Sequence, residues 1–529
     1  MENPKKPTSE EIKLDMTRSI ITEPLLSDVM RALQDPTNTD KFDVIISINE
    51  FFPGGIAGAM KEVVKRANEW KVPFSDLSPY VFACLSAQQL LSLAEEARAL
   101  TAKYGRSGTV VYRIWQDQDI STTLTKSIST VKADAAHRSF QAFGEGIVWA
   151  VLDSGIQGDH PHFKKSQPHF EKDSDDMLPL LHLDFTPAAR KLTRDPDAKP
   201  ASDRSALEDL FGHGSHVAGI IAGEWDFGKP EGAYVVGSEV RDETDEKKTI
   251  QQRDKLTRIS GIAPKAKLLS LKVIADRSLP NVQQTPGQGK VSWILMAIDQ
   301  IQRWNQYGKR VLVHGVNMSL GYEFDPRWFA CGQSPICVEV NRLVRSGVVV
   351  VVSAGNGGYS SIVTAGGNLQ SRYSSLSITD PGNAEMAITV GSTHREKPHL
   401  YGVSYFSSRG PTGDGRMKPD LLAPGERIVS CAAGLEKAKY PSFDSTGHPL
   451  TDRDGNPLPE VLYCEQTGTS MAAPHVSGAI AAFLSVRSEF IGEPERVKEF
   501  FMANTIDLRR ERCFQGAGLM DLMKVLQAV

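Results

Sequence analysis

The stretch Ile147-Val-Trp-Ala-Val-Leu152 is almost wholly apolar and runs directly into Asp153-Ser-Gly155. A strand with apolar side chains on both faces is typical of a parallel sheet covered by helices on both sides. Similar apolar runs follow at 267–273, 310–316 and 347–352, and they alternate with helical segments at 213–223, 290–304 and 336–346. This alternation predicts a doubly wound, mostly parallel α/β domain over 146–529, with its functional site at the carboxyl ends of the strands.

A different pattern precedes this domain. Residues 41–120 hold three strand-like runs and two helical segments, which predicts a small α+β module of the ferredoxin-like kind. Ser86 and Gln89 form a capping-box pattern at the start of the second helix. Residues 1–40 are polar and show little periodicity, so we expect a partly disordered extension there, with order beginning at Phe42. Residues 121–145 are predicted to be a linker that includes a processing region.

Three polar stretches interrupt the large domain, near 224–258, 360–380 and 435–460. The first is charged and poorly periodic, and the third is rich in Pro, Asp and Gly. We interpret the first as a surface insertion and the third as a loop. The second lies close to a candidate site residue and is expected to reshape the pocket there.

Composition limits the classes of partner. The chain has 529 residues, with 60 basic and 64 acidic side chains and a formal net charge of −4. Without a dominant positive field we expect no nucleic-acid partner, and without a long apolar run we expect no membrane partner. The N-terminus lacks the apolar stretch of a secretory signal, so a cytoplasmic location is predicted, in which the six cysteines are thiols. The alternative is a secreted protein whose signal has been removed, in which Cys331 and Cys337 are spaced to close a small disulfide loop.

Four strand-end or helix-start positions carry reactive side chains. Asp153 follows the strand at 147–152, and His213 opens the helical segment Gly212-His-Gly-Ser-His-Val-Ala-Gly219. Asn356 follows the strand at 347–352, and Ser470 lies in Gly468-Thr-Ser-Met-Ala-Ala-Pro-His475. If Thr469 caps the last of these helices, Ser470 lies in its first turn, where unpaired N–H groups favour negative charge.

These side-chain types are the set that acyl transfer needs. A serine hydroxyl becomes a nucleophile when a histidine takes its proton, and a carboxylate on the far ring nitrogen orients that histidine. The oxyanion of the tetrahedral intermediate needs hydrogen-bond donors, which an asparagine amide and the backbone N–H of Ser470 offer. Each residue alone is more often structural, but four such blocks in one order favour a catalytic interpretation.

The blocks around Asp153, His213, Asn356 and Ser470 resemble the signature blocks of the subtilisin family, in the family's Asp…His…Ser order. Further blocks agree, at Gly261-Ile-Ala-Pro264, Asn317-Met-Ser-Leu-Gly321 and Lys418-Pro-Asp-Leu-Leu-Ala-Pro-Gly425. The resemblance covers about 147–525, and the 42–115 module is similar in layout to the inhibitory prodomain of this family. The fold it implies is a subtilisin-like α/β domain.

The resemblance implies roles for individual residues. Asp153 corresponds to the orienting carboxylate, His213 to the general acid/base, Ser470 to the nucleophile and Asn356 to the oxyanion donor. The segment Ser319, Leu320 and Gly321 corresponds to the one that pairs with the substrate backbone, and Ala354 and Gly355 to the opposite wall of the first specificity pocket. Their neutral side chains suggest an apolar residue before the cut. No cofactor is needed for this chemistry; a structural calcium ion is allowed, but its ligands are not identified in this sequence.

The expected activity is therefore hydrolysis of proteins or peptides, restrained by the N-terminal module, whose tail at 116–121 and onward is predicted to lie in or near the substrate cleft. Two alternatives remain at this stage. One is a transpeptidase or peptide cyclase on the same fold, in which an amine resolves the acyl-enzyme. The other is a pseudoprotease that serves as a binding scaffold, which the complete set of reactive residues disfavours.

Overall fold

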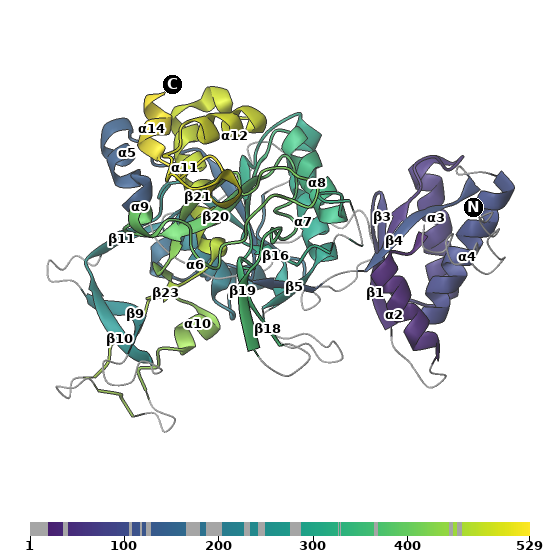
Figure 1. The fold of residues 1–529 in the computed structure, drawn as a ribbon, viewed down its shortest axis with the longest axis horizontal. Helices are drawn as coiled ribbons and strands as arrows, with labels where there is room; N and C mark the ends of the chain where they lie inside the picture. Colours follow the sequence, from purple (N-terminus) through teal and green to yellow (C-terminus); the bar gives the residue numbers. More distant parts are fainter. Residues whose placement is uncertain are drawn as a thin grey trace, which may run out of the picture. The chain divides into compact units, whose positions relative to one another are not determined.

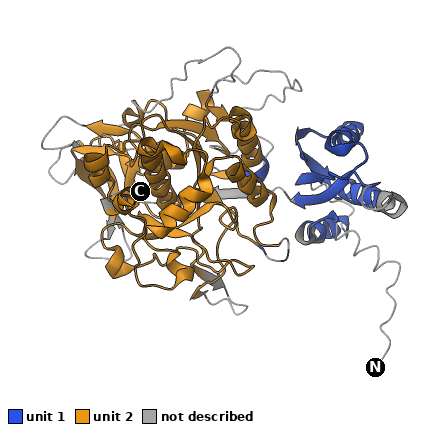
Figure 2. Cartoon of the chain, turned by 90° about the horizontal axis from the view of Figure 1, so that it is seen from above, with its two compact units in different colours: residues 1–119, 290–292, 325–329 blue, residues 120–289, 293–324, 330–529 orange. Residues whose placement is uncertain are grey.

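The computed structural model describes residues 20–34, 41–104, 108–116, 119–122, 129–164, 180–186, 204–226, 233–241, 249–275, 287–325, 327, 330–363, 369–443, 448–451 and 457–528. The chain divides into two compact units (Figure 2). The first unit comprises residues 1–119 with 290–292 and 325–329, and the second comprises 120–289, 293–324 and 330–529.

The first unit contains a four-stranded antiparallel sheet with the order β2-β3-β1-β4. Its elements in chain order are β1 (Lys41–Ile48), α3 (Gly55–Glu69), β2 (Phe74–Leu77), β3 (Tyr80–Ser86), α4 (Ala87–Tyr104) and β4 (Val111–Gln116). Helices α3 and α4 pack against the sheet, and apolar side chains from both layers form one core. This βαββαβ order confirms the predicted ferredoxin-like module, although β2, only four residues long, was not among the three expected strands.

The start of this unit differs from the prediction. Helix α2 (Glu23–Gln34) lies within the segment that was expected to be a polar extension, and it contacts α4. Its buried Leu25, Leu26 and Val29 belong to the core of the module. The apolar spacing within this short helix was missed because polar residues surround it. The capping box is confirmed, since the Ser86 N–H donates to Gln89 Oε1 at 2.8 Å and the Gln89 N–H to Ser86 Oγ at 3.3 Å.

The second unit is built on a seven-stranded sheet with the order β21-β20-β17-β15-β6-β12-β7 (Figure 1). Each neighbouring pair in this sheet is parallel. The strands are β6 (Val148–Asp153), β7 (Leu183–Asp184), β12 (Lys267–Lys272), β15 (Gly315–Met318), β17 (Val349–Ser353), β20 (Ile388–His394) and β21 (Leu421–Glu426). The predicted parallel α/β domain is therefore confirmed.

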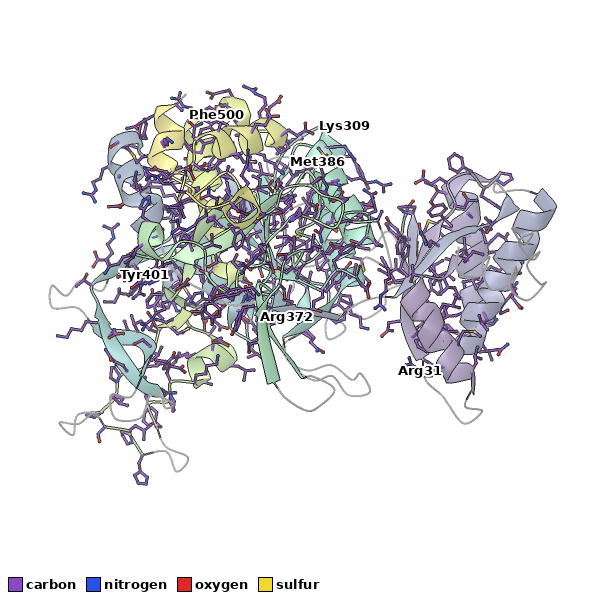
Figure 3. The ribbon with its side chains drawn as sticks, in the orientation of Figure 1. Arg31, Lys309, Arg372, Met386, Tyr401 and Phe500 are labelled. Carbon is purple, nitrogen blue, oxygen red and sulfur yellow. The ribbon has the colours of Figure 1, made fainter. Side chains whose placement is uncertain are left out.

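Helix α11 (Thr469–Val486) forms the centre of the second unit. It contacts β15, β17, β20 and β21 and also packs against α6 (His213–Ile221). Among the residues that the structure describes, α11 is the one helix whose length and composition would allow it to cross a membrane, and 89% of it is buried inside the protein. The other helices of the unit are α5 (Ala133–Phe140), α7 (Val291–Trp304), α8 (Pro335–Arg345), α9 (Pro398–Tyr401), α10 (Gly434–Ala438), α12 (Pro494–Ala503), α13 (Arg512–Gln515) and α14 (Leu522–Gln527). Phe500 on α12, labelled in Figure 3, packs against Phe483 of α11, with the two ring centroids 5.8 Å apart.

Two details of the sheet differ from the prediction. The strand expected at 310–316 begins only at Gly315, because Asn305 Oδ1 accepts the N–H groups of Leu312 and Val313 and holds that stretch as a turn. Strands β20 and β21 were not predicted, since β20 mixes apolar residues with Gly, Ser and Thr, and β21 contains Pro and Gly.

The insertions contain regular structure where the chain is described. The charged insertion, expected to be poorly periodic, forms β9 (Ala233–Arg241) and β10 (Thr249–Leu256), flanked by the antiparallel pair β8 (Glu224–Asp226) and β11 (Arg258–Ser260). Strand β9 joins β22 (Ile428–Cys431) and β23 (Tyr463–Gln466) in the sheet β10-β9-β23-β22. The second insertion forms the hairpin of β18 (Tyr359–Val363) and β19 (Leu369–Tyr373). The third contains α10, and residues 444–447 and 452–456 of it lie outside the described residues.

Buried neutral histidines make the fold sensitive to acid. Burial lowers the pKa of His162 and His475 to about 3 and that of His182 to about 4, from 6.5 in an unfolded chain. As the pH falls below 6.5 the unfolded chain therefore takes up protons first. The free energy of unfolding should be highest above pH 6.5 and fall toward pH 4, by up to about 1.4 kcal/mol per pH unit for each histidine.

Urea unfolding between pH 7.5 and 4.5 would measure this loss. Nδ1–H of His475 donates to the Met471 carbonyl at 2.7 Å, so glutamine can retain that contact. We expect His475→Gln to reduce the slope of the free energy of unfolding against pH by the contribution of about one proton. An unchanged slope in this variant would contradict the assignment.

Candidate active site

Four chain segments bring the predicted residues to one end of the parallel sheet. Asp153 is the last residue of β6, and His213 is the first residue of α6. Asn356 lies three residues beyond the end of β17, and Ser470 is the second residue of α11. Strands β6, β15 and β17 are neighbours in the sheet and helices α6 and α11 contact each other, so these segments converge.

The carboxylate and the imidazole form a direct hydrogen bond. Nδ1 of His213 lies 2.7 Å from Asp153 Oδ1, and both side chains are buried. An ionised carboxylate can only accept, so Nδ1 carries the hydrogen and Nε2 is the basic nitrogen. The Ser154 N–H also donates to Asp153 Oδ1, at 2.8 Å, which fixes the orientation of the carboxylate.

Asp209 supports this pair from behind, and the sequence motifs did not indicate it. Its carboxylate accepts from Ser154 Oγ at 2.9 Å and from the Gly212 N–H at 2.7 Å. It also accepts from the backbone N–H and the hydroxyl of Ser215, at 2.7 and 2.6 Å. Four donors on a fully buried carboxylate tie the residue after Asp153 to the turn that presents His213.

A proline in α11 explains how Ser470 is held. Pro474 lacks the N–H that would normally bond the Ser470 carbonyl, so this carbonyl loses its regular helical donor. The hydroxyl of Ser319 donates to it instead, at 2.6 Å. Ser470 Oγ in turn donates to the Ser319 carbonyl at 3.1 Å. The irregularity therefore ties the start of α11 to the segment 319–321.

Asn356 is oriented by Thr469. The Thr469 N–H and its hydroxyl donate to Asn356 Oδ1, at 2.9 and 3.0 Å. A backbone N–H cannot accept, so the oxygen of the amide faces Thr469 and the NH₂ group is left for another acceptor. The cap of α11 is Gly468 and Thr469 is its first helical residue, so Ser470 lies in the first turn although Thr469 is not the cap. The hydroxyl of Thr469 also accepts from the Gly355 N–H at 3.1 Å.

Both predicted pocket walls approach the side chain of Thr379. A Cβ added to Gly355 would meet Thr379 Oγ1 at 2.7 Å, and one added to Gly321 would meet the same atom at 2.9 Å. The Thr379 N–H also donates to the Ala354 carbonyl at 3.1 Å. Thr379 therefore fills space between the segments 319–321 and 354–355. It was missed because it lies at the end of the inserted stretch, outside every motif.

Backbone pairing also links the segment 319–321 to residues that follow the first unit. Strand β5 (Asp119–Thr122) runs antiparallel to β16 (Leu320–Gly321), with Thr122 opposite Leu320 and Ser121 opposite Gly321. Its other neighbour is β14 (Gln288–Lys290), in the sheet β13-β14-β5-β16 with β13 (Ile274–Ala275). Residues 117–118 and 123–128 of the predicted tail and processing region lie outside the described residues.

His216, the second histidine of the α6 motif, contacts backbone carbonyls. His216 Nε2 lies 3.2 Å from the Ile428 carbonyl and 3.1 Å from the Cys464 carbonyl. All six cysteines are free thiols. Within the described ranges, no group of three or more His, Cys, Asp or Glu side chains could hold a metal ion, so calcium remains a prediction without ligands.

Comparison with known proteins identifies relatives of this chain. A family model described as the subtilase family matches residues 144–519. The major intracellular serine protease of Bacillus subtilis (strain 168) is 26% identical over 382 residues, which cover 72% of this chain and 82% of the relative. The intracellular serine protease of Paenibacillus polymyxa is 24% identical over 420 residues, which cover 79% of this chain and 90% of the relative.

A solved structure shares the fold. Fervidolysin from Fervidobacterium pennivorans, a keratinolytic enzyme related to subtilisin, aligns with a TM-score of 0.53 at 18% identity. The alignment covers 92% of this chain and 61% of the length of fervidolysin. Because the family model spans most of the second unit, including all four candidate residues, the chain belongs to the subtilase family of serine proteases.

Proposed function

We propose that this subtilase is a serine endopeptidase in which Ser470 is the nucleophile, His213 the general acid/base and Asp153 the carboxylate that orients it. The observation that carries the proposal is the buried 2.7 Å bond from Asp153 to Nδ1 of His213, at the same end of the sheet as Ser470. This bond fixes the tautomer in which Nε2 can take a proton.

The reaction has two acyl-transfer steps. Ser470 Oγ attacks the peptide carbonyl while His213 Nε2 accepts its proton, and the imidazolium then returns that proton to the leaving amine. Water attacks the resulting acyl-enzyme by the same route in reverse, which releases the carboxylic acid product and restores Ser470. These steps use side chains and backbone groups of the protein and need no cofactor.

Asn356 is the proposed donor to the oxyanion. The bonds from Thr469 hold its Oδ1, so the NH₂ group is the part of the amide that can donate. The backbone N–H of Ser470, in the first turn of α11, is the second proposed donor. Donors that are fixed before the reaction stabilise the charge without reorganising as it forms.

A fluorophosphonate probe and product analysis test this function. We expect the probe to label Ser470 in the wild-type chain but not in a Ser470→Ala variant, and we expect mass spectrometry to find hydrolysed peptides. Absence of label on Ser470 would contradict the serine mechanism. Ligated or cyclic products in place of hydrolysed ones would instead indicate a transpeptidase.

The first specificity pocket is proposed to lie between segment 319–321 and segment 354–355, with Thr379 at its floor. The neutral walls favour an apolar substrate residue before the cut. Because Thr379 Oγ1 lies against both Gly321 and Gly355, the space between the walls suits a small apolar side chain such as alanine.

Thr379→Gly is expected to enlarge this pocket. Removing the side chain should raise kcat/KM for a peptide with Phe before the cut relative to one with Ala, by roughly 10–100-fold. The two peptides would be assayed side by side with wild type and variant. Thr505→Gly, at a hydroxyl that donates to the Ala517 carbonyl elsewhere, serves as a control and should leave the ratio unchanged. If the ratio of kcat/KM for the Phe peptide to that for the Ala peptide were the same in all three proteins, Thr379 would not line the pocket.

We propose further that β5 restrains the enzyme before it is processed. Antiparallel pairing with Leu320 and Gly321 puts this strand where a substrate backbone is proposed to bind, on the acyl side of the cut. His213 and Ser470 are fully buried in the intact chain, as expected if a segment of the chain covers the site before processing. Cleavage within 116–135 would release the restraint.

Ser121→Pro tests the role of β5. A strand with a neighbour on each side uses its N–H groups in the sheet, so proline removes a bond and should weaken the pairing. We expect Ser470 in the intact chain to react roughly five- to tenfold faster with a fluorophosphonate, the effect of about 1 kcal/mol. Ser121→Ala keeps the N–H and should behave as wild type. Equal labelling rates for all three chains would argue against restraint by β5.

An intracellular site of action is also proposed. Two relatives are named intracellular serine proteases, and the six cysteines of this chain are free thiols. Thiols persist where the environment is reducing.

A further inference from the structure

The hairpin β18–β19 carries an aromatic cluster on the surface close to the candidate oxyanion residue. Tyr359 begins β18 and pairs in register with Tyr373, the last residue of β19. Their ring centroids are 5.0 Å apart, and the ring of Tyr405 lies 5.9 Å from that of Tyr359. We call Tyr359, Tyr373 and Tyr405 the tyrosine cluster. Figure 1 shows the hairpin projecting from the second unit, and Arg372, next to Tyr373, is labelled in Figure 3.

The side chains of the tyrosine cluster are exposed to solvent, although large aromatic rings are usually buried. Tyr359, Tyr373 and Tyr405 are 39%, 64% and 61% exposed. Tyrosine combines a large apolar ring with a polar hydroxyl and loses little conformational entropy when it is covered, so exposed groups of tyrosines suit molecular recognition.

Buried bonds hold the cluster in place. Arg409, only 6% exposed, donates to the carbonyls of Gly358 and Tyr405, each at 3.1 Å. Its guanidinium also lies 5.0 Å from the ring centroid of Tyr373. A surface that is fixed before binding loses less entropy when a ligand binds.

The same backbone links the cluster to the reacting centre. Only Gly357 and Gly358 separate Asn356 from Tyr359, which limits the distance between the Cα atoms of Asn356 and Tyr359 to about 11 Å. Within this span the Gly357 N–H donates to Ser408 Oγ at 3.0 Å, and the Gly358 N–H donates to the Phe406 carbonyl at 2.8 Å. An extended peptide covers the same distance in about three residues.

The course of the chain indicates which side of the scissile bond the cluster serves. Residues 354–355 form the proposed pocket wall for the residue before the cut, Asn356 follows at the carbonyl, and Tyr359 comes after it. On the acyl side the substrate backbone is proposed to lie between β14 and β16, whereas β18 and β19 form a separate two-stranded sheet. The cluster is therefore expected beyond the scissile bond, on the side of the leaving amine.

The positive charges beside the tyrosine cluster limit which side chains it can bind. The buried guanidinium of Arg409 lies against the Tyr373 ring, and the exposed Arg372 adjoins it in sequence. A second cation over these rings would be repelled, so lysine or arginine is disfavoured. A neutral aromatic or large aliphatic side chain can stack on the rings without this cost.

We propose that Tyr359, Tyr373 and Tyr405 form a binding site for an aromatic or large aliphatic side chain of the substrate, two or three residues after the scissile bond. This inference rests on the proposed endopeptidase function, and it adds a preference on the leaving side to the pocket before the cut. The cluster acts on binding of the leaving segment and takes no part in proton transfer.

Paired quenched peptides test the proposal. The peptides would be identical except for Phe or Ala at the second or third position after the cut, with a matched pair varied at the second and third positions before it. Active sites would be counted with a fluorophosphonate. We expect wild type to prefer Phe after the cut by roughly tenfold in kcat/KM, mostly through KM, and lysine there to give no gain.

Tyr373→Ala should reduce this preference to about twofold or less while leaving the Ala peptide unaffected, and Tyr373→Phe should retain it. Tyr405→Ala, which leaves the paired residues of the hairpin intact, should also weaken it. Tyr307→Ala is the matched control, because Tyr307 is 65% exposed but lies between α7 and β15.

The possible outcomes separate the two hypotheses. If the chain shows no fluorophosphonate labelling and cleaves no peptide even after its N-terminal residues have been removed, the endopeptidase function itself fails. With labelling and cleavage intact, the proposed tyrosine site is overturned if wild type shows no Phe preference, if Tyr373→Ala and Tyr405→Ala both keep it, or if it appears only before the cut.

Discussion

Replacing Ser470 by alanine is expected to lower kcat by the order of a millionfold, the magnitude known for removal of the nucleophile from a subtilisin. The reason is that the hydroxyl is the only group proposed to form the acyl-enzyme, and it is held by Ser319 at the start of α11. Cleavage of a quenched peptide would be followed after the N-terminal residues of each variant had been removed by a separable wild-type protease.

The same experiment tests whether His213 and Ser470 act together. His213→Ala should lose about as much activity as Ser470→Ala, and the double variant should lose little more, because either change abolishes the same proton transfer. Ser485→Ala is the matched control on the same helix, since its hydroxyl bonds the Ala482 carbonyl and the Gly144 N–H. More than about 1% residual kcat in Ser470→Ala, or losses that multiply in the double variant, would contradict the proposed roles.

Much of the fold was predictable from the sequence because its strands are extreme in composition. Strands β6, β12 and β17 are buried throughout or nearly so, and their apolar runs stand out from the helices between them. Strands β20 and β21 escaped prediction for the opposite reason. Close packing between these two strands requires small residues such as Gly391, whose added Cβ would lie 2.7 Å from Leu422.

The candidate site also contains residues that the sequence predicted and residues that it did not. Asp153, His213, Asn356 and Ser470 were predictable because each lies in a distinctive motif at the end of a strand or the start of a helix. The supporting groups were not, because their roles depend on contacts across the fold. Asp209 lies four residues before His213 with no motif around it, and it becomes important only when Ser154, 55 residues away, donates to it.

The role of Pro474 shows the same limit. The sequence reveals that one carbonyl of α11 must lose its donor, but not which group replaces that donor. The structure supplies Ser319 Oγ, 151 residues away, so a local irregularity connects the nucleophile to the segment proposed to bind substrate. Such coupling cannot be derived from local propensity, which treats each helix separately.

Asn356→Ala is expected to lower kcat by roughly 10²–10³-fold with little change in KM, the magnitude measured at the corresponding asparagine of a subtilisin. The amide donates to charge that develops only in the transition state, so its loss should leave substrate binding nearly intact. Peptide kinetics would give kcat and KM separately, and circular dichroism would confirm that the variant is folded.

Asn356→Asp separates the role of the NH₂ group, the proposed donor to the oxyanion, from that of Oδ1, which accepts from Thr469. A carboxylate can still accept from the Thr469 N–H and hydroxyl, as Oδ1 does at 2.9 and 3.0 Å, but it offers no N–H and faces the oxyanion with a negative charge. We therefore expect this substitution to reduce kcat more than Asn356→Ala does, although it preserves the local bonds better. If the Asn356→Asp variant retained wild-type kcat, the side chain would serve only to hold Thr469, and the oxyanion would have to be stabilised by backbone N–H groups alone.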